Sequence, residues 1–291
     1  MPQAKIGVIG GSGLYKMKEL TDIEEVDINT PFGKPSAPIT IGRLEGVGIA
    51  FLPRHGRGHH ISPTEVPYRA NIYALKSLGV EWLISVNAVG SFKLKMKPGD
   101  LVIPDQLIDR TRSRVNSFFD EGIVVHIPFA QPFCPILSQI VFQAAKEIGA
   151  SVHPKGTYLA MEGPAFSTRA ESRLYRSWEA DIIGMTALPE AKLAREAEIC
   201  YAIIAGITDY DSWQERSQPI TVDVILNILR QNITTIKKII KLAVARIPEQ
   251  RHCGCATALK NAIVTAPELI PAEQKERLNL LISKYLIKGD K

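Results

Sequence analysis

Short apolar segments alternate with amphipathic segments along most of this chain. Strands are predicted at residues 5–10, 46–54, 81–91 and 200–207, and helices at residues 67–79, 136–149, 191–199 and 221–247. Such alternation is typical of an α/β fold, in which helices connect the strands of one sheet. With 291 residues, 45% of them hydrophobic, the chain is long enough for one large domain with a substantial core.

The only candidate domain boundary lies in residues 247–258. Residues 1–248 are predicted to form the main domain, and residues 249–291 a C-terminal extension that packs on it. Residues 271–286 of the extension have a helical pattern, with Pro271 in the first turn.

Composition excludes several classes of protein. The net charge of +5 is spread along the chain, so no nucleic-acid partner is expected. No stretch of about 20 apolar residues predicts a membrane span, and the N-terminus does not resemble a signal peptide. Four cysteines are too few for a disulfide framework in a chain of this size, which favours a cytoplasmic location.

Two segments contain groups suited to binding an anion. In "GVIGGSG" Lys16 stands where GxGxxG needs its third glycine, so what remains is a tight turn with Ser12 and exposed backbone amides, or an ordinary loop. "LPRHGRGHH" contains Arg54 and His55, and its arginines disfavour a metal ion. A phosphate-like anion or a solvent-exposed basic loop fits this second segment.

Further polar or small residues follow predicted strands, where ligands of open α/β sheets gather. Asn87 and Ala88 lie in "SVNAVGS", and Met185 and Thr186 precede a helix. In "GITDYDSW" two carboxylates close an apolar strand, and in an extended segment they point to the same side. Alone, this pair is compatible with a metal site or with the start of a loop.

Seven motifs occur in the order "GGSGLY", "RHGRGH", "NAVGS", "HIPFAQPFCP", "MEGPAFSTRAE", "GMTALPEAKLARE" and "TDYDSW". Over residues 4–245 the chain therefore resembles the trimeric branch of the purine nucleoside phosphorylase family. The resemblance implies one α/β domain with a mixed central β-sheet flanked by helices, to which the helical C-terminal appendage is added. It also implies a homotrimer, possibly paired into a dimer of trimers, that cleaves a nucleoside with inorganic phosphate as co-substrate and without a cofactor.

The resemblance also assigns roles by position. It implies a phosphate pocket formed by Ser12, Arg54, His55, Asn87, Ala88 and Thr186. Met185 is implied under the ribose and Phe166 against the sugar or base, while His126 is lent by a neighbouring subunit to the 5' side.

Three positions bear on substrate choice. Ser167 and Asp209 replace the glutamate and asparagine of relatives that take 6-oxopurines, which indicates an adenine base. Val222 replaces a histidine that binds a 5'-hydroxyl, which favours an apolar methylthio group. The expected substrate is therefore 5'-methylthioadenosine, with Asp209 as the catalytic acid at purine N7 and Asp211 at the amino group.

Other activities stay open. Asn87 and Gly184 resemble the nucleoside phosphorylase branch, in which broader or 6-oxopurine specificity is found. A nucleoside hydrolase would use the same acid, Asp209, with water as the nucleophile. A non-catalytic purine-nucleotide sensor would need no such acid.

The segment "HCGC" has no role in this scheme. Its three candidate ligands, His252, Cys253 and Cys255, would need a fourth to form a metal site. A strained disulfide is a second possibility. A simple turn is favoured, and no metal is expected.

Overall fold

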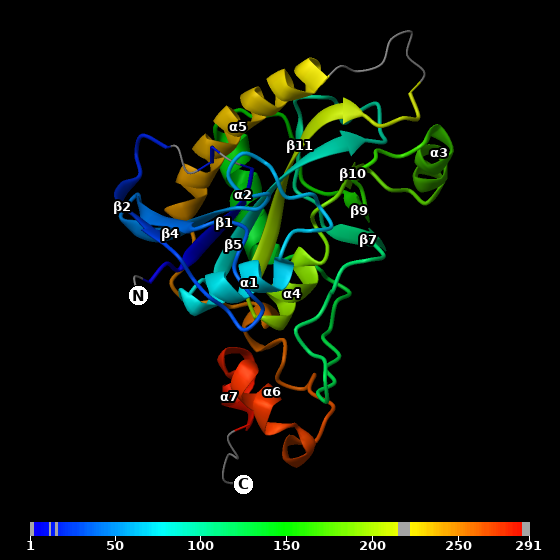
Figure 1. Ribbon diagram of the computed structural model, residues 1–291. Coiled ribbons are helices and arrows are strands. Elements are labelled where there is room, and N and C mark those ends of the chain that lie inside the picture. Colours follow the sequence, from blue (N-terminus) through cyan, green and yellow to red (C-terminus); the bar gives the residue numbers. More distant parts are fainter. Residues whose placement is uncertain (1–2, 12, 15–16, 215–221, 287–291) are drawn as a thin grey trace.

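The computed structural model describes residues 3–11, 13–14, 17–214 and 222–286, with the side chains of residues 222–226 excepted (Figure 1). Within this part of the chain, eleven strands form one mixed sheet. They are β1 (Ile6–Gly10), β2 (Thr21–Val26), β3 (Ile39–Leu44), β4 (Val47–Pro53), β5 (Trp82–Ser91), β6 (Leu101–Val102), β7 (Gln106–Arg110), β8 (Val152–His153), β9 (Thr157–Met161), β10 (Ile182–Gly184) and β11 (Cys200–Tyr210).

Strand β5 is the centre of the sheet. It pairs in parallel with β1 and β11 and antiparallel with β10. The main path runs β2-β3-β4-β1-β5-β10-β9-β7, and β11 continues from β5 to β6 and β8. Residues at the ends of β5, β10 and β11 are therefore brought close together.

Helices cover both faces of the sheet. The α-helices are α1 (Tyr68–Ser77), α2 (Pro135–Glu147), α3 (Arg169–Ser177), α4 (Glu190–Glu196), α5 (Val222–Val244), α6 (Ala272–Arg277) and α7 (Asn279–Leu286), and the 3-10 helices are η1 (Gly254–Thr257) and η2 (Pro267–Leu269). Side chains of α1 and α4 pack in one apolar core, and those of α2 and α5 in another. These two cores bury the two faces of the sheet, as expected for an α/β fold.

The predicted segments are confirmed, with adjusted ends. The strand predicted at residues 200–207 continues to Tyr210, and the helix predicted at 271–286 is split at Leu278. Leu278 is fully buried in the core that α1 shares, so tertiary packing overrides an uninterrupted helix there. The β2–β3 pair and α3 are additions that the sequence reading lacked, although Thr168 and Glu171 form the capping box that begins α3.

The C-terminal segment packs beside this body. Leu281 and Ile282 of α7 are buried in the same core as Ile72 and Leu75 of α1. In Figure 1 α6 and α7 lie at the lower end of the molecule, on the side of α1 and α4. Within the described residues, no helix has the length and apolar character that a membrane crossing requires.

Candidate active site

A β-bulge determines where the carboxylate of Asp209 lies. The register between β11 and β5 shifts after Ile207, so that Thr208 is the extra residue and Asp209 stands opposite Gly90. Bulges re-aim the side chains that follow them and are frequent beside active sites. The Thr208 hydroxyl donates to Asp209 Oδ1 over 2.7 Å, which fixes the half-buried carboxylate.

Asp211 lies on the same side of the strand as Asp209. A methyl group placed on Gly90 would lie 3.4 Å from Asp211 Cβ and 3.5 Å from Asp209 Oδ2. The buried Ser167 hydroxyl is 2.7 and 2.6 Å from the two oxygens of Asp211 and donates to one of them at a time. Tyr210 instead donates to the carbonyl of Leu94. The strand therefore presents two acids together, as its alternation predicts.

Asn87 of β5 and Thr186, which follows β10, form a buried polar wall. Asn87 Nδ2 donates to Thr186 Oγ1 over 2.8 Å and lies 3.3 Å from the hydroxyl of Tyr158. Because Thr186 Oγ1 accepts this bond, its own hydrogen is available to an anion. Gly184 belongs to the same group, since any side chain there would overlap the Tyr158 hydroxyl.

Arg54 lies close to this wall but is enclosed by protein. Its Nε and Nη2 donate to the two oxygens of Glu190 over 2.8 and 3.0 Å, and Nη1 donates to the carbonyl of Val86. Both side chains of the pair are almost fully buried. Burial opposes the charged form of Arg54, but the Glu190 carboxylate outweighs it and raises the arginine pKa. The guanidinium thus donates most of its hydrogen bonds to protein groups, mainly Glu190, and its contact with phosphate stays a prediction.

Glu190 is the main residue that the sequence reading missed. It accepts hydrogen bonds from Arg54 and from the Tyr201 hydroxyl, and Ser85 Oγ lies 2.7 Å away. Its signal in the sequence is an acid in the first turn of α4, four residues after Thr186. Ser85 also approaches Asn87 Oδ1 to 2.9 Å, so the ion pair is connected to the polar wall.

His55 is half-buried and has a defined tautomer. Its Nδ1 lies 2.9 Å from the carbonyl of Ile61, which can only accept, so Nδ1 carries the hydrogen. Burial, followed by the positive charge of Arg54, lowers the pKa of His55 to about 4. The neutral ring therefore offers Nε2 as an acceptor, suited to a phosphate hydroxyl, whereas the sequence reading expected a donor.

Of the remaining predicted site residues, some are exposed or half-buried, and others are not described by the structure. Ala88 is exposed although it belongs to the central strand, and it shares a strand face with Gly90. Phe166 is 74% exposed and adjoins the buried Ser167, while Met185 is half-buried. Ser12 lies outside the described residues, and Val222 begins α5 but its side chain is not described.

His126 lies apart from the acids, on the loop between β7 and α2. Its side chain is exposed, and its backbone N–H donates to the carbonyl of Ala262 in the C-terminal segment. In Figure 1 this loop runs from β7 down toward α6, away from the end of β11.

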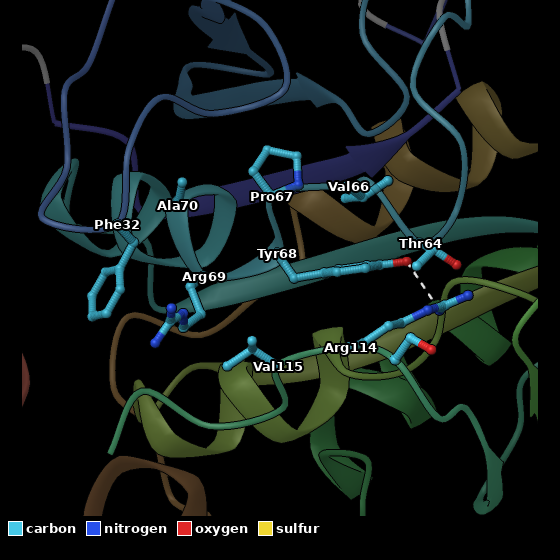
Figure 2. A pocket seen from close by; sticks show the side chains of 10 residues that line it. Phe32, Thr64, Val66, Pro67, Tyr68, Arg69, Ala70, Arg114 and Val115 are labelled. Carbon is cyan, nitrogen blue, oxygen red and sulfur yellow. Dashed lines mark hydrogen bonds between the residues drawn. The ribbon is translucent and has the colours of Figure 1, made fainter. Parts of the chain in front are cut away.

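A cavity of about 240 Å³ lies beside the predicted site (Figure 2). It is lined by Phe32, Thr64, Val66, Pro67, Tyr68, Arg69, Ala70, Ser113, Arg114 and Val115. Figure 2 shows Arg114 bonded to the Tyr68 hydroxyl, and Arg114 also donates to the backbone carbonyls of Met185 and Leu188. The cavity thus borders the backbone of Met185, but no residue assigned to the nucleoside or phosphate lines it.

Paired acids at one strand end, together with a buried polar wall suited to an anion, are compatible with a phosphate-dependent enzyme. The sequence matches the model of the phosphorylase superfamily over residues 5–245, so the chain belongs to this family. It is similar to the S-methyl-5'-thioadenosine phosphorylase of Geobacter sulfurreducens, with 57% identity covering 97% of this chain and 99% of that one. The corresponding protein of Thermosynechococcus vestitus is 54% identical, with 97% and 99% coverage.

Solved structures agree with these relatives. The crystal structure of a methylthioadenosine phosphorylase from an antarctic soil metagenomic library has a TM-score of 0.93 and 50% identity, covering 97% of this chain and 99% of that one. A mutant adenosine/methylthioadenosine phosphorylase from Schistosoma mansoni, in complex with methylthioadenosine, has a TM-score of 0.82 and 37% identity, with 89% and 96% coverage. The mixed sheet flanked by helices is therefore confirmed as the phosphorylase fold.

Proposed function

We propose that this protein cleaves 5'-methylthioadenosine with inorganic phosphate, giving adenine and 5-methylthioribose 1-phosphate. The observation that carries the proposal is the placement of Asp209 and the Ser167-bonded Asp211 over the same glycine. Two carboxylates on one side of a strand can serve the N7 and 6-amino positions of adenine together. The similarity to S-methyl-5'-thioadenosine phosphorylases over nearly the whole chain supports this substrate.

Phosphate is the nucleophile in the proposed reaction. The Thr186 hydroxyl donates to it, His55 Nε2 accepts from its protonated oxygen, and Ser12 and Ala88 complete the pocket. Arg54 acts indirectly, because its bonds to Ser85, Val86 and Glu190 join β5, which carries Asn87, to α4. The phosphate charge stabilises the oxocarbenium-like transition state, and a phosphate oxygen then attacks C1'.

Asp209, in its protonated form, is the proposed proton donor. Cleavage of the glycosidic bond places negative charge on the departing adenine, and a proton at N7 neutralises it. Asp211, held by Ser167, accepts a hydrogen bond from the 6-amino group. Met185 packs under the ribose, and the exposed Phe166 covers the sugar or base once the nucleoside is bound.

The 5' side of the pocket is proposed to be shared between subunits of a homotrimer, possibly assembled as a dimer of trimers. Val222 gives an apolar contact to the methylthio group, and His126 of one subunit reaches the site of its neighbour. Support comes from the exposure of His126 on a loop that runs away from its own acids.

Gly184 and Asn87 favour a second candidate, a nucleoside phosphorylase that also accepts 6-oxopurines. The packing offers a different reason for these residues, because the Tyr158 hydroxyl occupies the space beside Gly184 and lies within hydrogen-bond distance of Asn87. Neither Gly184 nor Tyr158 is assigned to the base. Adenine therefore stays the preferred base.

The proposed place of the enzyme is purine and methionine salvage in the cytoplasm, with phosphate as the only co-substrate and no cofactor. Methylthioadenosine, methylthioinosine, adenosine and inosine should be compared on one preparation, each with and without phosphate. We expect phosphate-dependent turnover that is highest with methylthioadenosine. Turnover in phosphate-free buffer would indicate a hydrolase, absence of turnover a sensor, and a preference for inosine the second candidate.

A further inference from the structure

Four cysteines from three separate parts of the chain meet at one point. Cys134 is the N-cap of α2, Cys200 is the first residue of β11, and Cys253 and Cys255 belong to the C-terminal segment. All four Sγ atoms lie within 4.8 Å of one another. Cys253 Sγ is 3.7 Å from that of Cys134 and 3.3 Å from that of Cys200.

These separations suit a tetrahedral thiolate site. Four sulfurs at about 2.3 Å from a zinc ion lie roughly 3.8 Å from one another, so small side-chain movements would complete the coordination. Cys134 and Cys200 are fully buried and Cys255 is 4% exposed, so three ligands come from the interior and close the site to water. Closed four-coordinate sites are structural, whereas catalytic zinc keeps an open position.

We propose that Cys134, Cys200, Cys253 and Cys255 bind one structural Zn²⁺ ion. Each thiol gives up its proton on binding. The ligand set has four soft sulfur atoms and no carboxylate, which favours zinc over magnesium or calcium. The fourth ligand that the "HCGC" segment lacked is thus supplied by the body, and His252, whose side chain is exposed, is not needed.

The surroundings fit a metal–thiolate group. Cys134 caps a helix of 13 residues, and the partial positive charge of a helix N-terminus favours thiolate ligands. Three of the cysteines pack in the core formed by α2 and α5, which keeps water away from the metal.

The consequence of the site is mechanical and does not depend on phosphorolysis. The metal would fasten the C-terminal segment to the starts of α2 and β11. Neighbouring contacts already join the C-terminal segment to the start of β11. Glu198, just before β11, accepts a hydrogen bond from the backbone N–H of Leu259 and forms an ion pair with Lys284.

The test is metal and thiol analysis of the full-length protein, purified without chelators from zinc-supplemented cells. We expect about one zinc per chain. Adding Co²⁺ to reduced, metal-free protein should give the charge-transfer and d–d absorption of a tetrahedral thiolate site. Absence of zinc and of the cobalt spectrum would overturn the proposal, as would alkylation and mass spectrometry that find these cysteines paired in disulfides under reducing purification.

Two neighbouring variants sharpen the result. Cys253→Ser alters the least buried ligand, and we expect its zinc content to fall from about one per chain to near zero. His252→Ala is the matched control and should keep the full zinc content. Retention of zinc by Cys253→Ser, or equal loss in both variants, would contradict the assignment. If Cys253→Ser does not fold, the cobalt spectrum of the unaltered chain decides alone.

Discussion

The carboxylate of Asp209 owes its position to one additional residue in β11. Without the bulge at Thr208, the residue opposite Gly90 would be Thr208, and the carboxylate would point to the other face of the sheet. The Thr208 hydroxyl then holds the carboxylate in place. The bulge thus places the proposed proton donor, Asp209, on the same side of the strand as Asp211.

Replacing Asp209 should separate chemistry from folding. In Asp209→Asn we expect kcat with methylthioadenosine to fall by about 10²- to 10⁴-fold, because the amide cannot protonate N7. The melting temperature should change little, since Thr208 can still donate to the amide oxygen. Steady-state kinetics and thermal unfolding measure both effects, with the exposed Asp27→Asn as a matched control. A loss of less than about tenfold would reject Asp209 as the proton donor.

His55 makes stability depend on pH in a defined direction. Its pKa is lowered from 6.5 to about 4, so between these values the unfolded chain binds a proton that the folded chain does not. Stability should therefore fall as the pH is lowered through this window. Because the ring is only partly buried, we expect a contribution on the order of 1 kcal/mol, which His55→Gln should remove.

The buried carboxyl of Glu196 changes stability with pH in the opposite direction. The His55 prediction therefore concerns the difference in stability between wild type and His55→Gln at each pH. Burial raises the pKa of Glu196 from 4.5 to about 7, and its contribution to stability therefore falls as the pH rises through that range. Denaturant unfolding should be measured for wild type and His55→Gln from pH 4 to 7. The Glu196 contribution is present in both proteins, so it cancels when their stabilities are subtracted. Parallel stability curves would contradict the assignment to His55.

The Arg54–Glu190 pair joins four elements of the fold. Arg54 follows β4, Glu190 begins α4, and the guanidinium also bonds Val86 of β5 and the carbonyl of Ile9 in β1. A buried pair of this kind is expensive to break, because the remaining charge has no solvent to replace its partner.

Glu190→Gln should consequently destabilise the protein by about 3–5 kcal/mol. The midpoint of urea unfolding measures this loss. Glu147→Gln is the matched control, because it breaks an exposed pair with Arg246, for which we expect less than about 1 kcal/mol. Equal losses in the two variants would mean that Arg54 does not depend on Glu190.

Assembly into a trimer can be tested by mixing two defective chains. His126→Ala removes the group that a subunit is proposed to lend, and Asp209→Asn removes the proposed acid of its own site. In randomly mixed trimers, about one site in four would combine an intact acid with an intact donor from the neighbouring subunit. Co-expression should therefore give more activity than the average of the two homogeneous proteins. Activity equal to that average would place His126 and Asp209 in the same subunit's site, or His126 outside it.

Strands and helices can be predicted from the sequence, whereas contacts between distant residues cannot. The strands at 81–91 and 200–207 are visible because their apolar runs are local. The pairing of Arg54 with Glu190 and the meeting of Cys134 with Cys253 are not, since more than 100 residues separate each pair and only the fold brings them together. The bulge at Thr208 is likewise a property of two paired strands, which a single strand does not encode.

The close approach of Tyr158 to Gly184 limits the order in which this sequence can change. A side chain at position 184 would collide with the tyrosine hydroxyl, which also lies within hydrogen-bond distance of Asn87. A larger residue at position 184 therefore requires a change at Tyr158 as well. A mutational path from this chain to one with a side chain at position 184 must first reduce or move Tyr158. We therefore expect Asn87, Tyr158 and Gly184 to vary together among phosphorylases, as a historical constraint on this buried polar wall.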